Sequence, residues 1–395
     1  MTRMEATPVR RVPRHELRLP DGVRERFQPE RAAALARLAG VEPGAYARTR
    51  NHLRGAVSRL SPYLTHGLVS VPEVVDALQA GAGKFVQELA WREYFQLVYE
   101  REGRAIFNDR FGPQPRRAEG PGSRRFPRAL RDGESGVTAL DQAVADLVDG
   151  GYLHNRQRLW LASVACHVAG ADWRAGAAWF FHHLLDGDLA SNTLSWQWVA
   201  GSGAARPYLA DQANLDRFSD TEQAGTFLDR PREALLHGPI PAPLRETASL
   251  DLPSTLPDLP PPHFDAQRPL LVYHPWSLDP TWRAAERADR WLLLEPSLIK
   301  RHPWSPLRLA WVLAVAATIP GLRLAVADAP ALLRSRAADA AAGRAAGVRH
   351  RSHTAVAHWP GPADAAPTAF AQRWTEPTAP RSFSAFWKRV GPGRS

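Results

Sequence analysis

The sequence predicts a mainly α-helical protein, in which an all-helical domain is followed by a small C-terminal α/β unit with a parallel sheet. From residue 30 to residue 218, apolar side chains recur at the i, i+3, i+4 spacing of helices, and β-branched alternation is nearly absent. A proline-dense stretch follows at 239–269. Beyond it, short apolar runs suited to strands alternate with a helical run, which is the rhythm of a parallel β-α-β unit.

The same patterns predict the individual elements in order. Helices are expected where the helical spacing is clearest, at 71–78, 85–99, 140–147, 153–168 and 173–185. In the C-terminal part we expect strands at 268–275, 290–297 and 321–328, a buried helix at 306–320 and a solvated helix at 329–347. The aromatic residues of the tail segment SFSAFWKRV are expected to dock on the body of the protein. The predicted regions are a basic N-terminal arm at 1–29, a helical domain at 30–230, a proline-rich linker at 231–267 and an α/β domain with its tail at 268–395.

Composition limits the class of protein. A chain of 395 residues with 44% hydrophobic side chains is large enough for two domains with buried cores. Cys166 is the single cysteine, which excludes an intrachain disulfide and a four-thiolate iron–sulfur cluster. There is no apolar run of 18 residues and no apolar core of a secretory signal, so we expect a soluble, cytoplasmic protein with no membrane partner, and a monomer.

Charge and histidine spacing bear on partners and metals. The formal net charge of +10 favours contact with polyanions, because neutralising phosphates releases condensed counterions. The histidines at 182, 183, 274 and 302 lack the spacing with carboxylate or thiol partners that a metal site needs, so no metal is predicted.

The segment DGDLASNTLSWQW, residues 186–198, holds the densest chemistry of the chain. In a helix, Asp188, Asn192 and Trp196 share one face and Trp198 points away from it. A carboxylate, an amide and an indole on one wall suit an electron-poor heterocycle, because the first two can hydrogen-bond its polar edges and the indole is easily oxidised. The alternative is an amphipathic core helix that begins with an Asp pair.

Four further blocks accompany this segment. They are SRLSPYLTHG at 58–67, QELAWREYF at 87–95, GYLHNRQR at 151–158 and DWRAGAAWF at 172–180. The five blocks, in this order, resemble the FAD-binding domain of the DNA photolyase and cryptochrome family, from about Tyr46 to Gly203. That family carries its α/β domain before the flavin domain, whereas here the α/β material follows it. This departure argues against a second, antenna chromophore such as a folate or a deazaflavin.

The resemblance implies FAD as the cofactor. The family segment that holds the diphosphate matches Ser58 to Ser61, although the ordinary helix start Ser61-Pro62 is an alternative. Asn192 matches the residue that faces flavin N5, where repair enzymes of the family keep asparagine. The positions implied to bind the cofactor are Tyr46, Ser58, Arg59, Leu60, Ser61, Arg92, Asn155, Asp186, Asp188 and Asn192.

The resemblance also implies damaged DNA carrying pyrimidine dimers as the partner. Glu88 matches the carboxylate that hydrogen-bonds the base edge of the dimer, and Arg156 matches a contact to the lesion phosphate. Trp91 and Trp198 match the two indoles that stack on the flipped-out dimer, with stacking of about 1–3 kcal/mol per base. Taken alone, Trp91 is as well explained as a core residue of an amphipathic helix.

Electron supply is the part of the resemblance that departs most. Trp196 and Trp173 match the first two members of the family's tryptophan relay, but the region of the third, near Gly120, has no tryptophan. Trp160 and Trp179 are either an alternative route or packing residues. The residues implied in the chemistry are Glu88, Asn155, Trp173, Asn192 and Trp196.

Three functions fit the sequence to different degrees. The first is a light-driven lyase of the photolyase type that splits pyrimidine dimers by electron transfer from reduced FAD. The second is a cryptochrome-like blue-light photoreceptor that binds FAD without repair activity. The third is a flavin-free nucleic-acid-binding scaffold. Asn192 and Glu88 favour the first.

Overall fold

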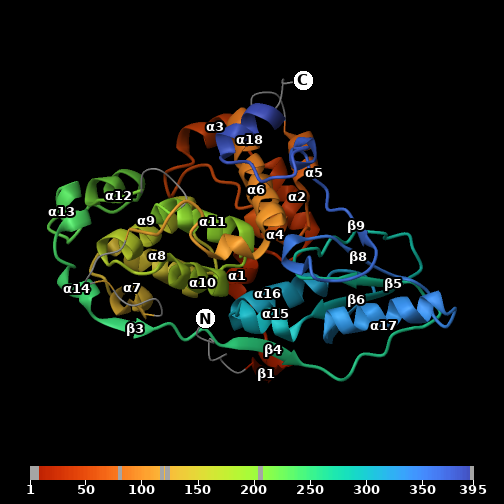
Figure 1. Cartoon of the computed structure of the whole chain (residues 1–395). Coiled ribbons are helices and arrows are strands. Elements are labelled where there is room, and N and C mark those ends of the chain that lie inside the picture. Colours follow the sequence, from red (N-terminus) through yellow and green to blue (C-terminus); the bar gives the residue numbers. More distant parts are fainter. Residues whose placement is uncertain (1–8, 79–81, 116–119, 121–124, 203–207, 392–395) are drawn as a thin grey trace. The chain divides into compact units, whose positions relative to one another are not determined.

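The computed structural model describes residues 9–78, 82–115, 120, 125–202 and 208–391 (Figure 1). The chain forms two compact units that are interleaved in the sequence. One is an α/β unit, made of the segments Met1–Gly40, Arg59–Ala77 and Leu252–Ala369. The other is a helical unit, made of Val41–Ser58, Leu78–Asp251 and Phe370–Ser395.

A five-stranded sheet forms the centre of the α/β unit. Its strands run in the order β7-β6-β5-β8-β9 and all pair in parallel, with Leu271 of β5 opposite Arg290 of β6 and Arg349 of β8. The strands of the unit are β1 (Val9–Pro13), β4 (Ser254–Asp258), β5 (Leu270–Tyr273), β6 (Asp289–Leu294), β7 (Leu322–Val326), β8 (Val348–Arg351) and β9 (Ala363–Asp364). Its helices are α1 (Asp21–Arg26), α2 (Arg31–Ala39), α4 (Ser61–Thr65), α5 (Val71–Ala77), α15 (Pro296–Arg301), α16 (Pro306–Ala316) and α17 (Ala329–Ala341).

The N-terminal segments belong to the core of this unit. Phe27 and Trp311 of α16 are both fully buried, and the Trp311 indole donates a 2.9 Å hydrogen bond to the Phe27 carbonyl. Tyr63 packs edge-on against the same indole, with 5.9 Å between ring centroids. Residues far apart in sequence therefore share one apolar core.

Two sequence expectations differ from this arrangement. Residues from Val9 onward do not form an arm, because β1 pairs in parallel with β4, Val9 lying opposite Ser254. β4 lies inside the stretch expected to be a proline-rich linker, and its first four residues are buried. Local periodicity misses this pair because each strand acquires its backbone partners from a distant part of the chain. The predicted regions follow chain order, whereas the compact units are interleaved, and the boundaries themselves stay a prediction.

Helices make up most of the second unit. The longest is α6 (Gly83–Glu102), and α11 (Leu189–Ala200) packs against it as well as against α9 and α10. The other helices are α3 (Pro43–Thr49), α7 (Arg128–Asp132), α8 (Thr138–Val148), α9 (Asn155–Ser163), α10 (Trp173–His183), α12 (Gln212–Phe218), α13 (Arg232–His237), α14 (Ala242–Arg245) and α18 (Phe383–Val390). One short antiparallel pair joins β2 (Arg125–Pro127) to β3 (Thr247–Ser249).

Side-chain caps explain why the helices that carry the candidate site begin where they do. His154 caps α9, since its Nδ1 accepts from the Arg156 backbone N–H at 3.1 Å. Asp172 caps α10 and Asp188 caps α11 in the same way, with a 2.8 Å bond from the Ser191 N–H to Asp188. Each cap satisfies a backbone donor that the first turn leaves without a partner. Gly201 ends α11 in the left-handed region, at a φ of 81°.

The fold class predicted from the sequence is confirmed: a helical part and a parallel α/β sheet. The five helices expected in the helical domain all form, and the segment expected at 153–168 consists of α9 and a π-helical turn at Val164–Val168. In the α/β part the three predicted strands and both predicted helices are present. β8 and β9 extend the sheet beyond the residues from which a sheet was expected. Of the helices that the structure describes, none is long and apolar enough to span a membrane.

Candidate functional site

One face of α6 meets the start of α11. Glu88, Arg92 and Gln96 follow each other at one-turn spacing and therefore share a face of α6. Gln96 donates from Nε2 to Oδ2 of Asp188 over 2.5 Å. Arg92 is half-buried one turn away and makes no ion pair within the described residues. A half-buried guanidinium without a counter-ion is a donor for an anionic or carbonyl-bearing group.

The two predicted carboxylates lie at the entrance of α11 and have different partners. Asp188 is 1% exposed and caps the helix. Asp186 is 7% exposed and accepts a 2.7 Å ion-paired hydrogen bond from Nη2 of Arg158 on α9. The Asp186–Arg158 pair links the α10–α11 connection to α9, which carries Asn155 at its exposed first position.

Asn192 is fixed one turn into α11. Its side-chain Nδ2 donates to the Ala177 carbonyl of α10 over 2.8 Å. Because the amide nitrogen is used in this way, the amide oxygen is the polar end that remains for a ligand. The neutral amide at this position carries no proton that it could give up at ordinary pH.

The two tryptophans of α11 face opposite environments, as the helical spacing predicted. Trp196 is 2% exposed and packs edge-on against Phe180, with 4.8 Å between centroids, whereas Trp198 is 41% exposed. Trp196 lies on Gly176 of α10, where a Cβ atom would come within 2.2 Å of its ring. Its buried Nε1 has no hydrogen-bond partner in the part of the chain that the structure describes. An indole N–H in that condition is a second donor for a bound group.

Trp198 is part of an aromatic and basic cluster, which we define as Trp198, Tyr208 and Arg156. The rings of Trp198 and Tyr208 lie nearly parallel, at 27° and 6.1 Å. Arg156 Nη1 lies 3.4 Å from the Tyr208 hydroxyl, and its guanidinium covers the Phe218 ring at 4.2 Å. The Tyr208 hydroxyl in turn donates to Asn214 at 3.0 Å. This cluster combines a stacking surface with a cation, the chemistry expected at a nucleic-acid contact.

Trp91, the other predicted stacking indole, is covered on one face by the protein itself. The Phe383 ring of α18 lies parallel to it, at 10° and 3.8 Å between centroids. Trp91 remains half-buried rather than fully buried. Trp91 and Trp198 thus differ in access, because an exposed indole surface belongs mainly to Trp198.

Glu88 and Tyr46 lie near the start of α6. Glu88 pairs with Lys84 at 2.9 Å and with Arg50 at 3.7 Å, and its side chain stays 35% exposed. Tyr46 packs edge-on against Phe85 at 4.7 Å. Burial, and secondarily the charge of Glu88, raises the pKa of the Tyr46 phenol well above its usual value, so this hydroxyl stays a neutral donor.

The segment predicted to hold a diphosphate crosses from one unit to the other. Ser58 ends a segment of the helical unit, while Arg59, Leu60 and Ser61 begin a segment of the α/β unit. Arg59 adopts a φ of 51°, a left-handed conformation that a non-glycine residue seldom takes. Leu60 is buried, and Ser61 begins α4 with Pro62 behind it. Their role in binding a cofactor stays a prediction.

The tryptophans near the predicted relay are buried. Trp173 donates from Nε1 to the Asp109 carboxylate at 2.7 Å and is 1% exposed. Phe180 touches both Trp196 and Trp179, at 4.8 and 5.6 Å. Trp160 donates to Asn214 at 2.9 Å, so it supports the aromatic and basic cluster. The position expected for the third relay member is flanked by segments that lie outside the described residues.

Sequence reasoning missed four residues that the geometry brings into the site. Arg158 lies inside a recognised block, and Gln96 continues the one-turn spacing of Glu88 and Arg92. Both could have been found from helical spacing and charge. Tyr208 follows a segment without a recognised motif, and Phe383 comes from the far end of the chain. No sequence signal paired either of these two with its tryptophan.

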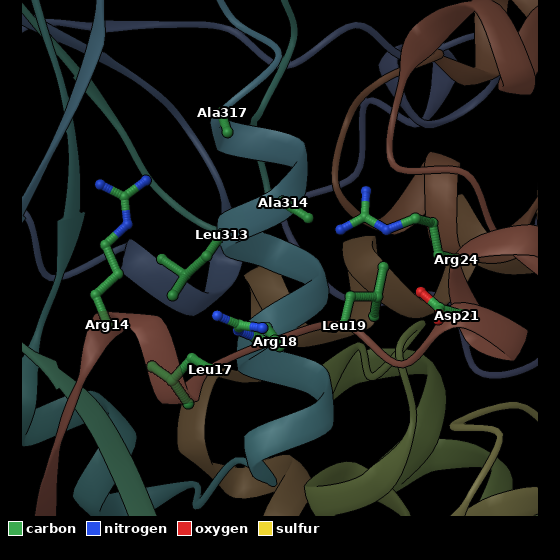
Figure 2. Close-up of a pocket in the computed structure, with 10 residues that line it drawn as sticks. Arg14, Leu17, Arg18, Leu19, Asp21, Arg24, Leu313, Ala314 and Ala317 are labelled. Carbon is green, nitrogen blue, oxygen red and sulfur yellow. The ribbon is translucent and has the colours of Figure 1, made fainter.

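The α/β unit has a surface hollow of its own, of about 350 Å³ (Figure 2). Its guanidinium groups stand around an apolar floor on α16, as Figure 2 shows. The lining residues that decide its character are Arg14, Arg18, Arg24, Asp21, Leu313 and Ala317. Its excess of positive charge would attract an anion. In the described part of the chain, no group of three His, Cys, Asp or Glu side chains could hold a metal ion.

Comparison with known proteins gives the class of the helical unit. Residues 85–230 match the FAD binding domain of DNA photolyase. The deoxyribodipyrimidine photo-lyase of Streptomyces griseus is 38% identical over 152 residues, which are 38% of this chain and 33% of that protein. The cryptochrome DASH of Natronomonas pharaonis is 36% identical over 197 residues, 46% of this chain and 41% of that protein.

A solved structure shows the same partial coverage. The crystal structure of a bacterial class III photolyase from Agrobacterium tumefaciens aligns with 51% of this chain and 46% of its own, at 29% identity and a TM-score of 0.44. The chain thus spans less than half the length of each of these relatives. Over residues 85–230 it belongs to the DNA photolyase and cryptochrome family, through the FAD-binding domain.

The residues of the helical unit fit a flavin. Arg92 supplies a half-buried cation without a counter-ion, and Trp196 supplies a buried N–H without an acceptor. Asn192 retains an amide oxygen, and Asp188 lies beside Gln96 on the same wall. Donors and acceptors in this mixture match the polar edges of an isoalloxazine ring.

Proposed function

We propose that this protein is a light-driven DNA-repair flavoprotein of the deoxyribodipyrimidine photolyase type, which splits pyrimidine dimers by electron transfer from reduced FAD. The observation that carries the proposal is the meeting of α6 and α11. There Arg92, without a counter-ion, lies one turn from the Gln96–Asp188 hydrogen bond, inside the segment that matches the FAD-binding domain. When bound, FAD would supply the light-driven electron that opens the cyclobutane ring and would take it back afterwards.

In this proposal the residues of the chain position and bind. Arg92, Asp188 and Asn192 hold the flavin edge. Asp186, Arg158 and the cap of α9 fix the wall that carries Asn155. Because Asn192 is an amide held by Ala177, it donates no proton to the flavin, which favours the fully reduced anionic form that repair requires.

The substrate is a damaged DNA strand whose dimer is turned out of the helix. A poorly stacked dimer costs little to extrude, and aromatic faces recover stacking energy. Trp198 offers its exposed face, and Arg156 in the same cluster offers a cation to the phosphate. Glu88 stays partly exposed near the start of α6 and can accept from a base edge.

The test is light-driven conversion of a defined lesion. Purified protein reconstituted with FAD and chemically reduced is mixed with an oligonucleotide that carries one thymine dimer, and the product is followed by chromatography in the light and in the dark. Repair only in the light supports the proposal. An unchanged lesion after illumination of a flavin-loaded protein would contradict it.

A cryptochrome-like photoreceptor without repair activity is the second candidate. The stack of Phe383 on Trp91 favours it, because a covered indole offers less surface to an extruded base. In that case the protein would bind FAD and change its absorption spectrum on illumination, while the thymine dimer would persist.

A further inference from the structure

The C-terminal segment, residues 370–391, is folded onto α6, the helix that carries Glu88, Trp91 and Arg92. Figure 1 shows α18 of this segment, in dark blue, beside α6. The segment begins with a fixed anchor: one oxygen of the Glu93 carboxylate accepts from the backbone N–H groups of Phe370 and Ala371, at 2.8 and 2.7 Å. Charge-assisted bonds of this kind to a 4% exposed carboxylate hold the chain firmly.

Apolar burial holds the rest of the segment. Phe386 and Val390 of α18 are both fully buried. The Phe386 ring lies 5.7 Å from the Tyr94 ring of α6. Arg373 donates to the Val390 carbonyl at 3.1 Å, which ties the start of the segment to its end. α18 therefore presents one apolar face to α6.

The foremost residue of this face is Phe383, and it lies on Trp91. The two rings are parallel within 10°, with centroids 3.8 Å apart, and Phe383 is 7% exposed. A nucleobase stacking on an indole adopts the same parallel geometry at a similar separation. Phe383 thus occupies the surface of Trp91 on which a base would stack.

We propose that Phe383 is an intramolecular competitor for the base that Trp91 would bind, and that damaged DNA displaces α18 from α6 when its extruded dimer enters. This inference rests on the proposed function. The closed state is maintained in the free protein because opening exposes Phe383 and Phe386 to water. An extruded dimer restores the lost stack, so only DNA with an available base offsets the displacement.

Phe383→Ala in the full chain tests the competition, with Ser384→Ala on the exposed side of α18 as the matched control. The affinity of each protein for a thymine-dimer oligonucleotide and for the same oligonucleotide without the lesion is measured by fluorescence anisotropy. Removing one aromatic competitor should tighten lesion binding about two- to tenfold, the range that one aromatic pair contributes. Binding of the undamaged oligonucleotide should not change, and Ser384→Ala should resemble the wild type. Lesion affinity that is unchanged or weaker in Phe383→Ala overturns the proposal.

Hydrogen exchange gives a second readout that needs neither light nor repair. Amides of residues 383–390 should exchange faster when lesion DNA is bound to the wild-type protein than when it is free. Exchange that stays the same or slows means that α18 remains in place, which also overturns the proposal. Phe383→Leu keeps an apolar side chain in the contact and should give an affinity between those of the wild type and the alanine variant.

The outcomes separate this proposal from the proposed function. If the wild type prefers the lesion and Phe383→Ala does not improve on it, repair stands and the competition is wrong. If only Phe383→Ala prefers the lesion, the competition is supported and is strong enough to block the wild-type site. If neither protein prefers the lesion, both proposals fail.

Discussion

Single side chains decide what this site can bind. Trp198 and Trp196 lie on opposite faces of α11, and their exposed fractions, 41% and 2%, assign them different tasks. An exposed indole that stacks only on Tyr208 is available to a partner, while a buried indole is part of the wall. The side chain most accessible to an extruded base is therefore Trp198.

Trp198→Ala should weaken lesion binding without unfolding the protein. The loss of one stacked base corresponds to about 1–3 kcal/mol, or roughly a five- to hundredfold drop in affinity. Thermal unfolding should change little, because so much of the indole already faces water. Leu35→Ala, at a similarly exposed apolar residue of the α/β unit, is the control and should leave affinity unaltered. Equal affinities of the wild type and Trp198→Ala would remove Trp198 from the site.

His183 makes the stability of the helical unit depend on pH. Burial lowers its pKa from 6.5 to about 4. Between these values the unfolded chain binds a proton that the folded chain does not, so stability falls as the pH is lowered from 6.5 towards 4 and is unaffected by this group above 6.5. His183→Asn should flatten that part of the profile. Urea unfolding at pH 7 and pH 5 measures it, and an identical pH dependence in wild type and variant would contradict the assignment.

At the scale of elements, the close approach of α10 and α11 is set by Gly176. A methyl group there would lie 2.2 Å from Cη2 of Trp196. Since Trp196 is surrounded by packed groups, its ring has little room to move.

Gly176→Ala should therefore destabilise the protein, by about 1–3 kcal/mol for an overpacked core. This direction is the reverse of what helix propensity predicts, since alanine is the better helix former. Gly83→Ala is the matched control: it lies on α6 with nothing within 4 Å of the added carbon, and it should be neutral or stabilising. Chemical denaturation compares the two variants, and a stabilised Gly176→Ala would show that the helices can separate at no cost.

The sequence was sufficient for elements with strong periodicity and insufficient for their pairing over long distances. The helices α6 and α11 were expected with their functional residues on the observed faces, because residue spacing along a helix fixes direction. The strand β1 was missed, because its partner β4 lies in a proline-rich stretch about which local patterns say nothing. The tail was expected to dock through its aromatic residues, but its contact with Trp91 could not be deduced, since Phe383 and Trp91 are connected only through the folded chain.

At the scale of the whole molecule, charge controls the association with DNA. There are 50 Lys and Arg residues against 40 Asp and Glu residues, and Arg14, Arg18 and Arg24 surround one surface hollow. This excess acts on any polyanion, whereas the aromatic cluster acts on an extruded base.

Binding to undamaged DNA should therefore weaken steeply with salt. The logarithm of the association constant should fall linearly with the logarithm of salt concentration, with a slope near −0.9 per phosphate neutralised. The ratio of lesion to undamaged affinity should change much less, since stacking releases no counterions. Anisotropy titrations at several salt concentrations measure both quantities. A lesion preference that disappears in parallel with non-specific binding would make the protein a charge-driven scaffold.

The central claim is that the wall formed by α6 and α11 binds FAD. The most direct measurement is the stoichiometry and affinity of FAD for the full-length protein, by visible absorption and calorimetry, in wild type and in Arg92→Leu. We predict one FAD per chain in the wild type and at least about tenfold weaker binding in the variant, because a charge-assisted hydrogen bond contributes about 1.5–3 kcal/mol. A protein that binds no flavin, or that binds it equally well without the guanidinium of Arg92, would contradict the account.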